Sequence, residues 1–176
     1  MTKQSSSTNA GGTANPLIIR VTAGSGKGRT TMAAFDSALR SAGVADHNLI
    51  RLSSIIPPGS VVETCLPEEQ LRGDFGDMLY CVYAVALATE RGDDAWSGIG
   101  WSRATDGTGR GLFVEHTGHA EEQVRTMITS SLIDMGNGRD DAFAFEDMVL
   151  SSAHCSGQPA CSVVVATYRT AGWVEE

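Results

Sequence analysis

The longest apolar run of the chain, MLYCVYAVALAT at residues 78–89, most restricts how the chain can fold. A helix that crosses a membrane needs about 20 apolar residues, so this run is too short to span a bilayer. The run contains aromatic and β-branched side chains, which favour a strand that is buried on both faces. We therefore expect residues 78–89 to form a core strand.

Seven further segments carry the residues typical of strands and are bounded by turn-forming residues. Two other segments have apolar residues at helical spacing, the second with Glu121 and Glu122 in its first turn. Runs of strands between two helices predict an α+β fold, a layered sandwich. The predicted strands are 17–23, 49–52, 61–65, 96–103, 111–116, 148–154 and 160–168, and the predicted helices run from Thr30 or Thr31 to about 42 and from 120 to 135.

The length of 176 residues fits one domain, which we expect over residues 16–176. Residues 1–15 are predicted to be a disordered leader because they offer almost nothing to bury. The leader lacks the apolar core of a signal peptide, so a cytoplasmic protein is expected. The net charge of −8 argues against nucleic acid or a membrane as a partner and is mildly favourable for a cationic substrate.

The cysteines, Cys65, Cys81, Cys155 and Cys161, form no CxxC pair and have no histidines at a matching spacing. We expect free thiols and no metal site. No role is assigned to the histidines His47, His116 and His119.

A glycine-rich segment, GSGKGRTT at residues 24–31, lies between a predicted strand and a predicted helix. A phosphate-binding loop requires the pattern G-x-x-x-x-G-K-[ST], but here Gly28 follows Lys27. The dinucleotide pattern G-x-G-x-x-G is also absent. We predict a flexible loop whose glycines let the backbone approach another element.

Two adjacent serines, Ser53 and Ser54, lie in the segment LSSIIPPG at residues 52–59. The Ser54 hydroxyl stands one residue downstream of the Ser53 carbonyl, which it can attack in an N-to-O acyl shift. Strain in a tight bend and a hydrogen-bond donor on that carbonyl oxygen favour such a shift. The ester formed can eliminate to dehydroalanine, which hydrolyses to a pyruvoyl group. On its own, the Ser-Ser pair indicates a strand end and a turn.

The surrounding segment, AFDSALRSAGVADHNLIRLSSIIPPG at residues 34–59, resembles the pyruvoyl-dependent arginine decarboxylase family. The resemblance rests on an A-F-D-x-A-L helix, an A-G-[IV]-x-x-x-N-L-[IV] segment and a Ser-Ser pair inside [LI]-S-S-I-[IM]-P-P. All three occur here at matching separations. The similarity extends more weakly to the C-terminus, including GLFVEHTG at residues 111–118, and residues 65–106 align only loosely.

The resemblance implies a self-processing decarboxylase whose covalent pyruvoyl group derives from Ser54, without metal or pyridoxal phosphate. Cleavage after Ser53 would give a β chain of residues 1–53 and an α chain of residues 54–176. Asn48 is the implied oxyanion partner of the Ser53 carbonyl during this step.

For the decarboxylation itself, the resemblance implies that L-arginine forms a Schiff base with the pyruvoyl group and leaves as agmatine and CO2. Glu115, in the apolar strand GLFVEH, is the implied proton donor. Asp36 is the implied partner of the substrate guanidinium.

The same resemblance implies a four-layer αββα sandwich that assembles as a homotrimer or a dimer of trimers, with an active site at each subunit junction. Two alternatives remain within this fold: a decarboxylase of a different amino acid, and a binding relative without catalysis, which would stay uncleaved. An ordinary serine hydrolase would need the pattern G-x-S-x-G, which the chain lacks.

Overall fold

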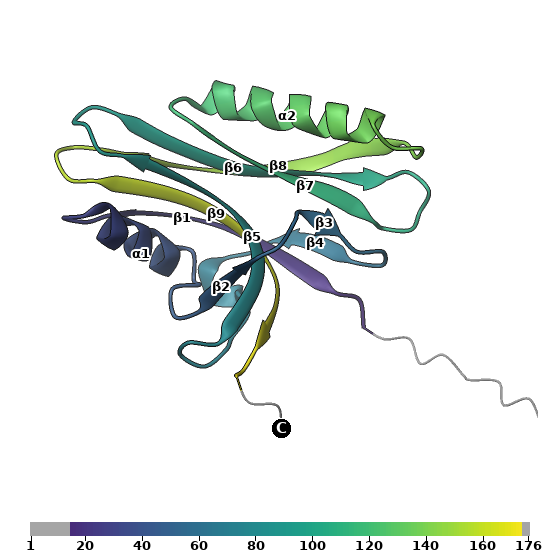
Figure 1. Cartoon of the computed structure of the whole chain (residues 1–176), viewed down its shortest axis with the longest axis horizontal. Helices are drawn as coiled ribbons and strands as arrows, with labels where there is room; N and C mark the ends of the chain where they lie inside the picture. Colours follow the sequence, from purple (N-terminus) through teal and green to yellow (C-terminus); the bar gives the residue numbers. More distant parts are fainter. Residues whose placement is uncertain (1–14, 174–176) are drawn as a thin grey trace, which may run out of the picture.

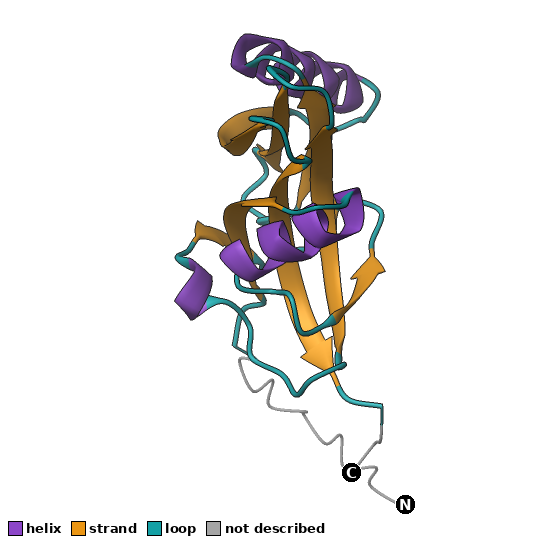
Figure 2. Ribbon diagram, turned by 90° about the vertical axis from the view of Figure 1, so that its left-hand side faces the viewer, coloured by secondary structure: helices purple, strands orange, loops and turns teal. Residues whose placement is uncertain are grey.

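Two β-sheets, A and B, pack face to face in the computed structural model, which describes residues 15–173 (Figure 1). Helix α1 (Thr31–Ser41) packs on the outer side of sheet A, and helix α2 (Glu121–Asn137) packs on the outer side of sheet B (Figure 1, Figure 2). This mixed α/β arrangement is compatible with the predicted α+β sandwich. Of the predicted leader, residues 1–14 lie outside the described residues.

Sheet A has the strand order β2-β5-β9-β1-β4, and sheet B has the order β3-β7-β6-β8. In sheet A, β1 runs antiparallel to β9 and parallel to β4, while β2 runs parallel to β5. In sheet B, β6 is antiparallel to both of its neighbours. The strands are β1 (Ile18–Lys27), β2 (Asn48–Arg51), β3 (Ile55–Ile56), β4 (Val61–Thr64), β5 (Met78–Ala88), β6 (Asp94–Ala104), β7 (Gly111–Gly118), β8 (Phe143–His154) and β9 (Ala160–Ala171), with a short 3-10 helix, η1, at Pro67–Glu69.

Side chains that alternate along the central strand β9 connect the layers. Val164 and Ala166 point toward sheet B and pack in the same cluster as Phe113. Val163 and Val165 point the other way and pack under α1. All five side chains are fully buried, so the middle of β9, from Val163 to Ala166, is apolar on both faces, as expected of a core strand.

Most predicted elements are confirmed, with small shifts at their ends. Helix α1 begins after Thr30, whose Oγ1 accepts a hydrogen bond from Ala33 N at 3.1 Å, and Gly43 follows its end with a φ of +80°. Strand β8 begins at Phe143 instead of Met148, and neither β3 nor η1 was predicted. None of the helices within residues 15–173 is both long and apolar enough to cross a membrane.

The glycine segment GSGK is the end of strand β1, so the predicted flexible loop was wrong at residues 24–27. Strand β1 pairs with β9 as far as Lys27, and α1 lies directly against Gly24, Gly26 and Gly28. A β-carbon on Gly26 would lie 2.6 Å from the backbone carbonyl carbon of Ser37. The predicted close approach of backbones is therefore confirmed, because the glycines let a helix rest on a strand.

Replacing Gly26 with alanine should destabilise the protein by roughly 1–3 kcal/mol, because the added methyl group meets helix backbone. Denaturant unfolding measures the change. Gly136→Ala in α2 is the matched control, since a β-carbon there finds its nearest neighbour, Phe143 Cβ, at an ordinary 3.5 Å. If both variants were as stable as the parent, the close packing of α1 on β1 would be contradicted.

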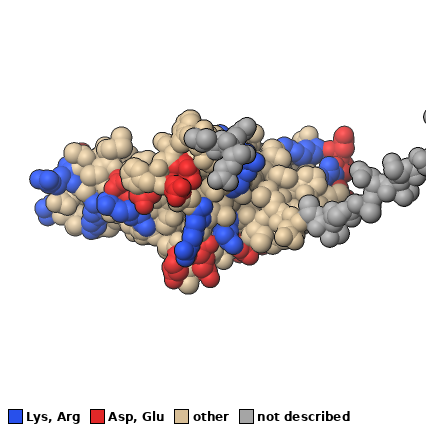
Figure 3. Space-filling model, turned by 90° about the horizontal axis from the view of Figure 1, so that it is seen from below, with Lys and Arg blue, Asp and Glu red and all other residues tan. Residues whose placement is uncertain are grey.

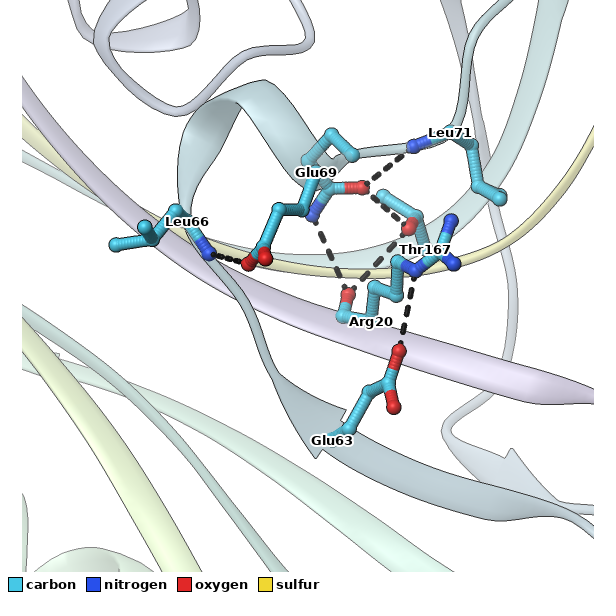
Figure 4. A network of polar contacts seen from close by, with 7 residues as sticks. Arg20, Glu63, Leu66, Glu69, Leu71 and Thr167 are labelled. Carbon is cyan, nitrogen blue, oxygen red and sulfur yellow. Dashed lines mark hydrogen bonds and ion pairs between the residues drawn. The ribbon is translucent and has the colours of Figure 1, made fainter.

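A network of hydrogen bonds and one ion pair connects the segment between β4 and β5 to sheet A (Figure 4). The buried Gln70 side chain accepts hydrogen bonds from Thr167 Oγ1 at 2.7 Å and from Leu71 N at 3.2 Å. Its amide donates to the Arg20 carbonyl at 3.5 Å, and Arg20 Nε pairs with Glu63 at 3.2 Å. Because its polar atoms are satisfied, Gln70 can stay buried and hold this segment on β1 and β9.

Candidate active site

Ser54 has an unusual backbone conformation in the turn between β2 and β3. Its φ of +67° is the only positive φ at a residue other than glycine within residues 15–173. This left-handed region brings the β-carbon close to the following carbonyl oxygen, at a cost of roughly 1–2 kcal/mol. Such conformations persist where neighbouring contacts impose them, and they cluster at reactive sites.

The backbone on the C-terminal side of Ser54 is held by both sheets. The Ser54 carbonyl accepts a hydrogen bond from Phe113 N at 2.9 Å, and Ile55 pairs with Leu112 in sheet B. From sheet A, the Tyr168 hydroxyl donates to the Ile55 carbonyl at 3.0 Å. Each of these contacts lies downstream of the Ser53–Ser54 bond.

The Ser54 hydroxyl lies against the carboxylate of Glu115. Ser54 Oγ donates a hydrogen bond to Glu115 Oε1 at 2.5 Å, although the residues are 61 positions apart in the sequence. Glu115 is half-buried in β7, on the same side of the strand as Phe113, and so lies toward sheet A. The structure therefore brings together two of the residues named from the sequence, at a distance that permits proton exchange.

A cavity of about 300 Å³ opens beside Glu115, between β5, β7 and α2. Among residues 15–173, the Lys or Arg side chain that lines it is Arg51, whose Cζ lies 4.9 Å from the ring centre of Tyr83. A cavity of this size suits a small polar metabolite. The residues that line it are Arg51, Tyr83, Ala84, Val85, Glu115, His116, Thr117 and Met127.

Burial sets the charge of two groups around Glu115. It lowers the pKa of His116, and the negative charge of Glu115 partly opposes this shift. His116 Nε2 lies 2.7 Å from Ser131 Oγ, so a neutral imidazole has a partner on α2. Burial also raises the pKa of Tyr168, and the charge of Glu115 raises it further. The Tyr168 hydroxyl therefore keeps its proton and acts as a donor.

The Asn48 side chain does not hydrogen-bond to the Ser53 carbonyl of its own chain. Its side-chain amide donates to the Gly76 carbonyl at 2.6 Å. Strand β2 then carries the backbone away from Asn48 at about 3.3 Å per residue, which separates the Asn48 side chain from Ser53.

Asp36 lies on the exposed side of α1 and pairs with Arg40 at 2.5 Å. Because α1 covers the outer side of sheet A, that sheet separates Asp36 from Glu115 (Figure 1). The structure leaves both Asp36 and Asn48 available at the surface, away from the Ser54 hydroxyl of the same chain.

Within residues 15–173, no three His, Cys, Asp or Glu side chains come together as ligands of a metal ion would. The four cysteines are free thiols, as predicted. Burial raises the pKa of Cys81 to about 12 and that of Cys161 to about 11, so both thiols stay protonated in the core.

Charge on the face seen in Figure 3 is mixed, with acidic and basic side chains close to one another. A broad field of one sign would steer an oppositely charged ligand toward this face. The mixed pattern gives no such indication, so the identity of a ligand has to be argued from the site residues.

Comparison with known proteins places these residues in a wider context. Residues 18–171 match the family described as pyruvoyl-dependent arginine decarboxylase (PvlArgDC). The chain is 33% identical over 156 residues to the pyruvoyl-dependent arginine decarboxylase of Halobacterium salinarum. This match covers 85% of the chain and 92% of the Halobacterium protein. It is 29% identical over 134 residues to pyruvoyl-dependent arginine decarboxylase 2 of Archaeoglobus fulgidus, with 73% and 84% covered.

A third relative, the pyruvoyl-dependent arginine decarboxylase of Picrophilus torridus, is 32% identical over 108 residues. This match covers 61% of the chain and 59% of the Picrophilus protein. The family match spans both Ser54 and Glu115, the two residues that the fold brings into contact.

Proposed function

Because the chain belongs to the pyruvoyl-dependent arginine decarboxylase family, we propose that it cleaves itself between Ser53 and Ser54 and then converts L-arginine to agmatine and CO2. The observation that carries the proposal is the geometry of Ser54, which combines a positive φ with a hydroxyl hydrogen-bonded to Glu115. The products would be residues 1–53 and 54–176, within a four-layer αββα sandwich.

Self-cleavage would begin at the Ser54 hydroxyl. Oγ attacks the carbonyl carbon of Ser53, the peptide C–N bond breaks, and the Ser54 nitrogen gains a proton to become a free amine. β-Elimination then releases Ser53 as a carboxylate and leaves dehydroalanine at position 54. Water replaces the nitrogen as ammonia, so a pyruvoyl group ends the chain 54–176. The left-handed conformation of Ser54 supports this route, because breaking the bond relieves its strain.

The residues around Ser54 fit a pyruvoyl group. When present, this group supplies the carbonyl that withdraws the electrons released as CO2 leaves. Phe113 N holds the Ser54 carbonyl, which cleavage leaves intact. Glu115 lies 2.5 Å from Ser54 Oγ and would deliver a proton to the substrate Cα. Its half-buried position limits competition from water.

Asn48 and Asp36 would act at the site of a neighbouring copy. Both side chains are exposed, and neither reaches the Ser54 hydroxyl of its own chain. A homotrimer or a dimer of trimers with a site at each junction would bring an Asn48 amide to the exposed Ser53 carbonyl. It would also bring an Asp36 carboxylate to the guanidinium of the substrate.

The Asp36→Asn variant should have a KM for arginine roughly 10- to 100-fold higher, because a hydrogen bond to a charged group contributes about 1.5–3 kcal/mol. Self-cleavage should change little, and a gel of the purified protein shows this. Arg40→Gln is the matched control, since it removes the same ion pair and keeps the carboxylate. An equal rise in KM in both variants, or equal damage to cleavage and turnover, would argue against substrate binding by Asp36.

The proposed function is tested first by the intact mass of the purified protein under denaturing conditions. We expect two fragments that end and begin at the Ser53–Ser54 bond, the larger with a blocked N-terminus that reacts with ketone reagents. Release of CO2 from arginine is then measured on the same sample. A single 18.5 kDa species that is inert towards arginine would refute the proposal.

A further inference from the structure

We propose that Tyr168 is a positioning residue whose hydroxyl holds the newly formed end of chain 54–176 in line with Glu115. This inference rests on the proposed function and assigns a role to a side chain outside the set named from the sequence. Its basis is one hydrogen bond that crosses from sheet A to sheet B, from Tyr168 on β9 to the Ile55 carbonyl on β3 at 3.0 Å.

Tyr168 is itself firmly placed. Its side chain is only 7% exposed and belongs to the cluster between the two sheets. Its ring packs edge-to-face against Phe113, with 6.3 Å between ring centres and 71° between ring planes. A phenol packed in this way has little rotational freedom. Its hydroxyl can therefore hold the Ile55 carbonyl in a fixed position.

Few side-chain hydrogen bonds hold residues 53–56, although the Ile56 side chain is buried in the core. Within residues 15–173, the side chains that hydrogen-bond to this segment are those of Glu115 and Tyr168. Strand β3 has only two residues, pairs on one side alone, and leaves the Ile55 side chain 50% exposed. The segment therefore depends on individual contacts more than a longer strand would.

Cleavage would make the position of residue 54 depend more strongly on these individual contacts. Before cleavage, β2 and Leu52 restrain Ser54 from the upstream side, since Leu52 N donates to the Cys81 carbonyl at 2.9 Å. After cleavage, position 54 is a chain end, and the restraints left to it are downstream. These are the Phe113 N–H on the Ser54 carbonyl, the short pairing of β3, the buried Ile56 side chain, and the Tyr168 hydroxyl.

The position of that chain end decides whether Glu115 can reach the reacting carbon. Displacements of about 1 Å can lower a rate by about 100-fold, because reacting groups need close and aligned contact. The Tyr168 hydroxyl would therefore matter for turnover more than for binding, and more after cleavage than before it. Burial keeps this hydroxyl protonated, so it can only donate to the carbonyl.

The test compares Tyr168→Phe with the parent protein and with Tyr80→Phe. Tyr168→Phe keeps the ring against Phe113 and removes one oxygen atom, so the protein is expected to fold, as its Tm will show. We expect nearly complete self-cleavage, a KM within about twofold of the parent, and a kcat lower by roughly 10- to 100-fold. Tyr80→Phe removes a phenol hydroxyl from a ring that lies under Arg169. Within residues 15–173, the side chains that hydrogen-bond to residues 53–56 do not include Tyr80, so this variant should keep its kcat.

The outcomes separate this inference from the function on which it rests. A parent protein that neither cleaves nor releases CO2 refutes the function. A parent that works, together with a Tyr168→Phe variant that keeps its kcat but has a lower Tm, shows a purely structural role and overturns the inference. A rise in KM without a fall in kcat also overturns it, because Tyr168 would then affect binding and not the position of the chain end.

Discussion

The Ser54→Ala variant should remain a single 18.5 kDa polypeptide and release no CO2 from arginine. Alanine has no hydroxyl to attack the Ser53 carbonyl, so neither the ester nor the pyruvoyl group can form. Only one hydrogen bond, from Ser54 Oγ to Glu115, is lost, which typically lowers stability by about 1 kcal/mol. The variant should therefore fold, and intact mass and CO2 release are measured on the folded protein.

Ser53→Ala is the matched control for this result. Ser53 is exposed and contributes its carbonyl to the reaction, which alanine also supplies. The Ser53→Ala chain should still cleave and turn over. If Ser54→Ala were cut at the same bond, or if only Ser53→Ala stayed intact, the attacking hydroxyl would have to be assigned to another residue.

The second large effect is expected at Glu115. The Glu115→Gln chain should still cleave, because the amide oxygen of glutamine can accept the hydrogen bond from Ser54 Oγ. Turnover should fall by roughly 100- to 10,000-fold, since an amide cannot deliver a proton as a carboxylic acid does. The extent of cleavage is read from a denaturing gel, and kcat from CO2 release by the cleaved protein.

Glu121→Gln on the exposed side of α2 controls for a general loss of negative charge. Glu121 pairs with Arg125 at 2.7 Å and does not line the cavity beside Glu115. This variant should match the parent in cleavage and turnover. Full activity in Glu115→Gln would exclude Glu115 as the proton donor, and failure to cleave would show that its charge is already needed for processing.

The fold could be predicted where buried side chains repeat with the period of their element. In α2, Val124, Ile128 and Leu132 are buried and face sheet B, and the sequence shows this spacing directly. The end of β1 could not be recognised, because Gly24 and Gly26 have no side chains to form a pattern. What those glycines contact lies in α1, more than ten residues later in the sequence.

Two strands were missed or shortened for related reasons. Strand β3 has only two residues, too few for any period to appear. The first part of β8 lies at the edge of sheet B and is largely exposed, so its side chains do not alternate between buried and exposed. Strand positions that face solvent on both sides carry little signal in a single sequence.

Only part of the candidate site was accessible from the sequence. Ser54 and Glu115 were named through a family resemblance, and alternation along β7 could not decide which face Glu115 takes. Tyr168 was missed because it ends the apolar run ACSVVVATY and reads as a core residue. A buried tyrosine hydroxyl usually has a hydrogen-bond partner, so a tyrosine in an apolar strand could have been predicted to hold a polar group in the core. The partner, Ile55, lies 113 residues away and needed the fold to be found.

The strand order of sheet A has a consequence for the order in which the chain would fold and be cleaved. Strand β1 lies between β9 and β4, and β2 lies beside β5, so both strands that the structure describes before Ser54 are paired with strands after it. Once the bond at Ser54 is cut, these internal pairings would become the interface of two separate polypeptides. A denatured mature protein could refold only after two chains meet, with a stability that depends on concentration. Cleavage would then make folding hard to reverse, because the single chain that folded no longer exists. The intact precursor would have to fold before it is cut.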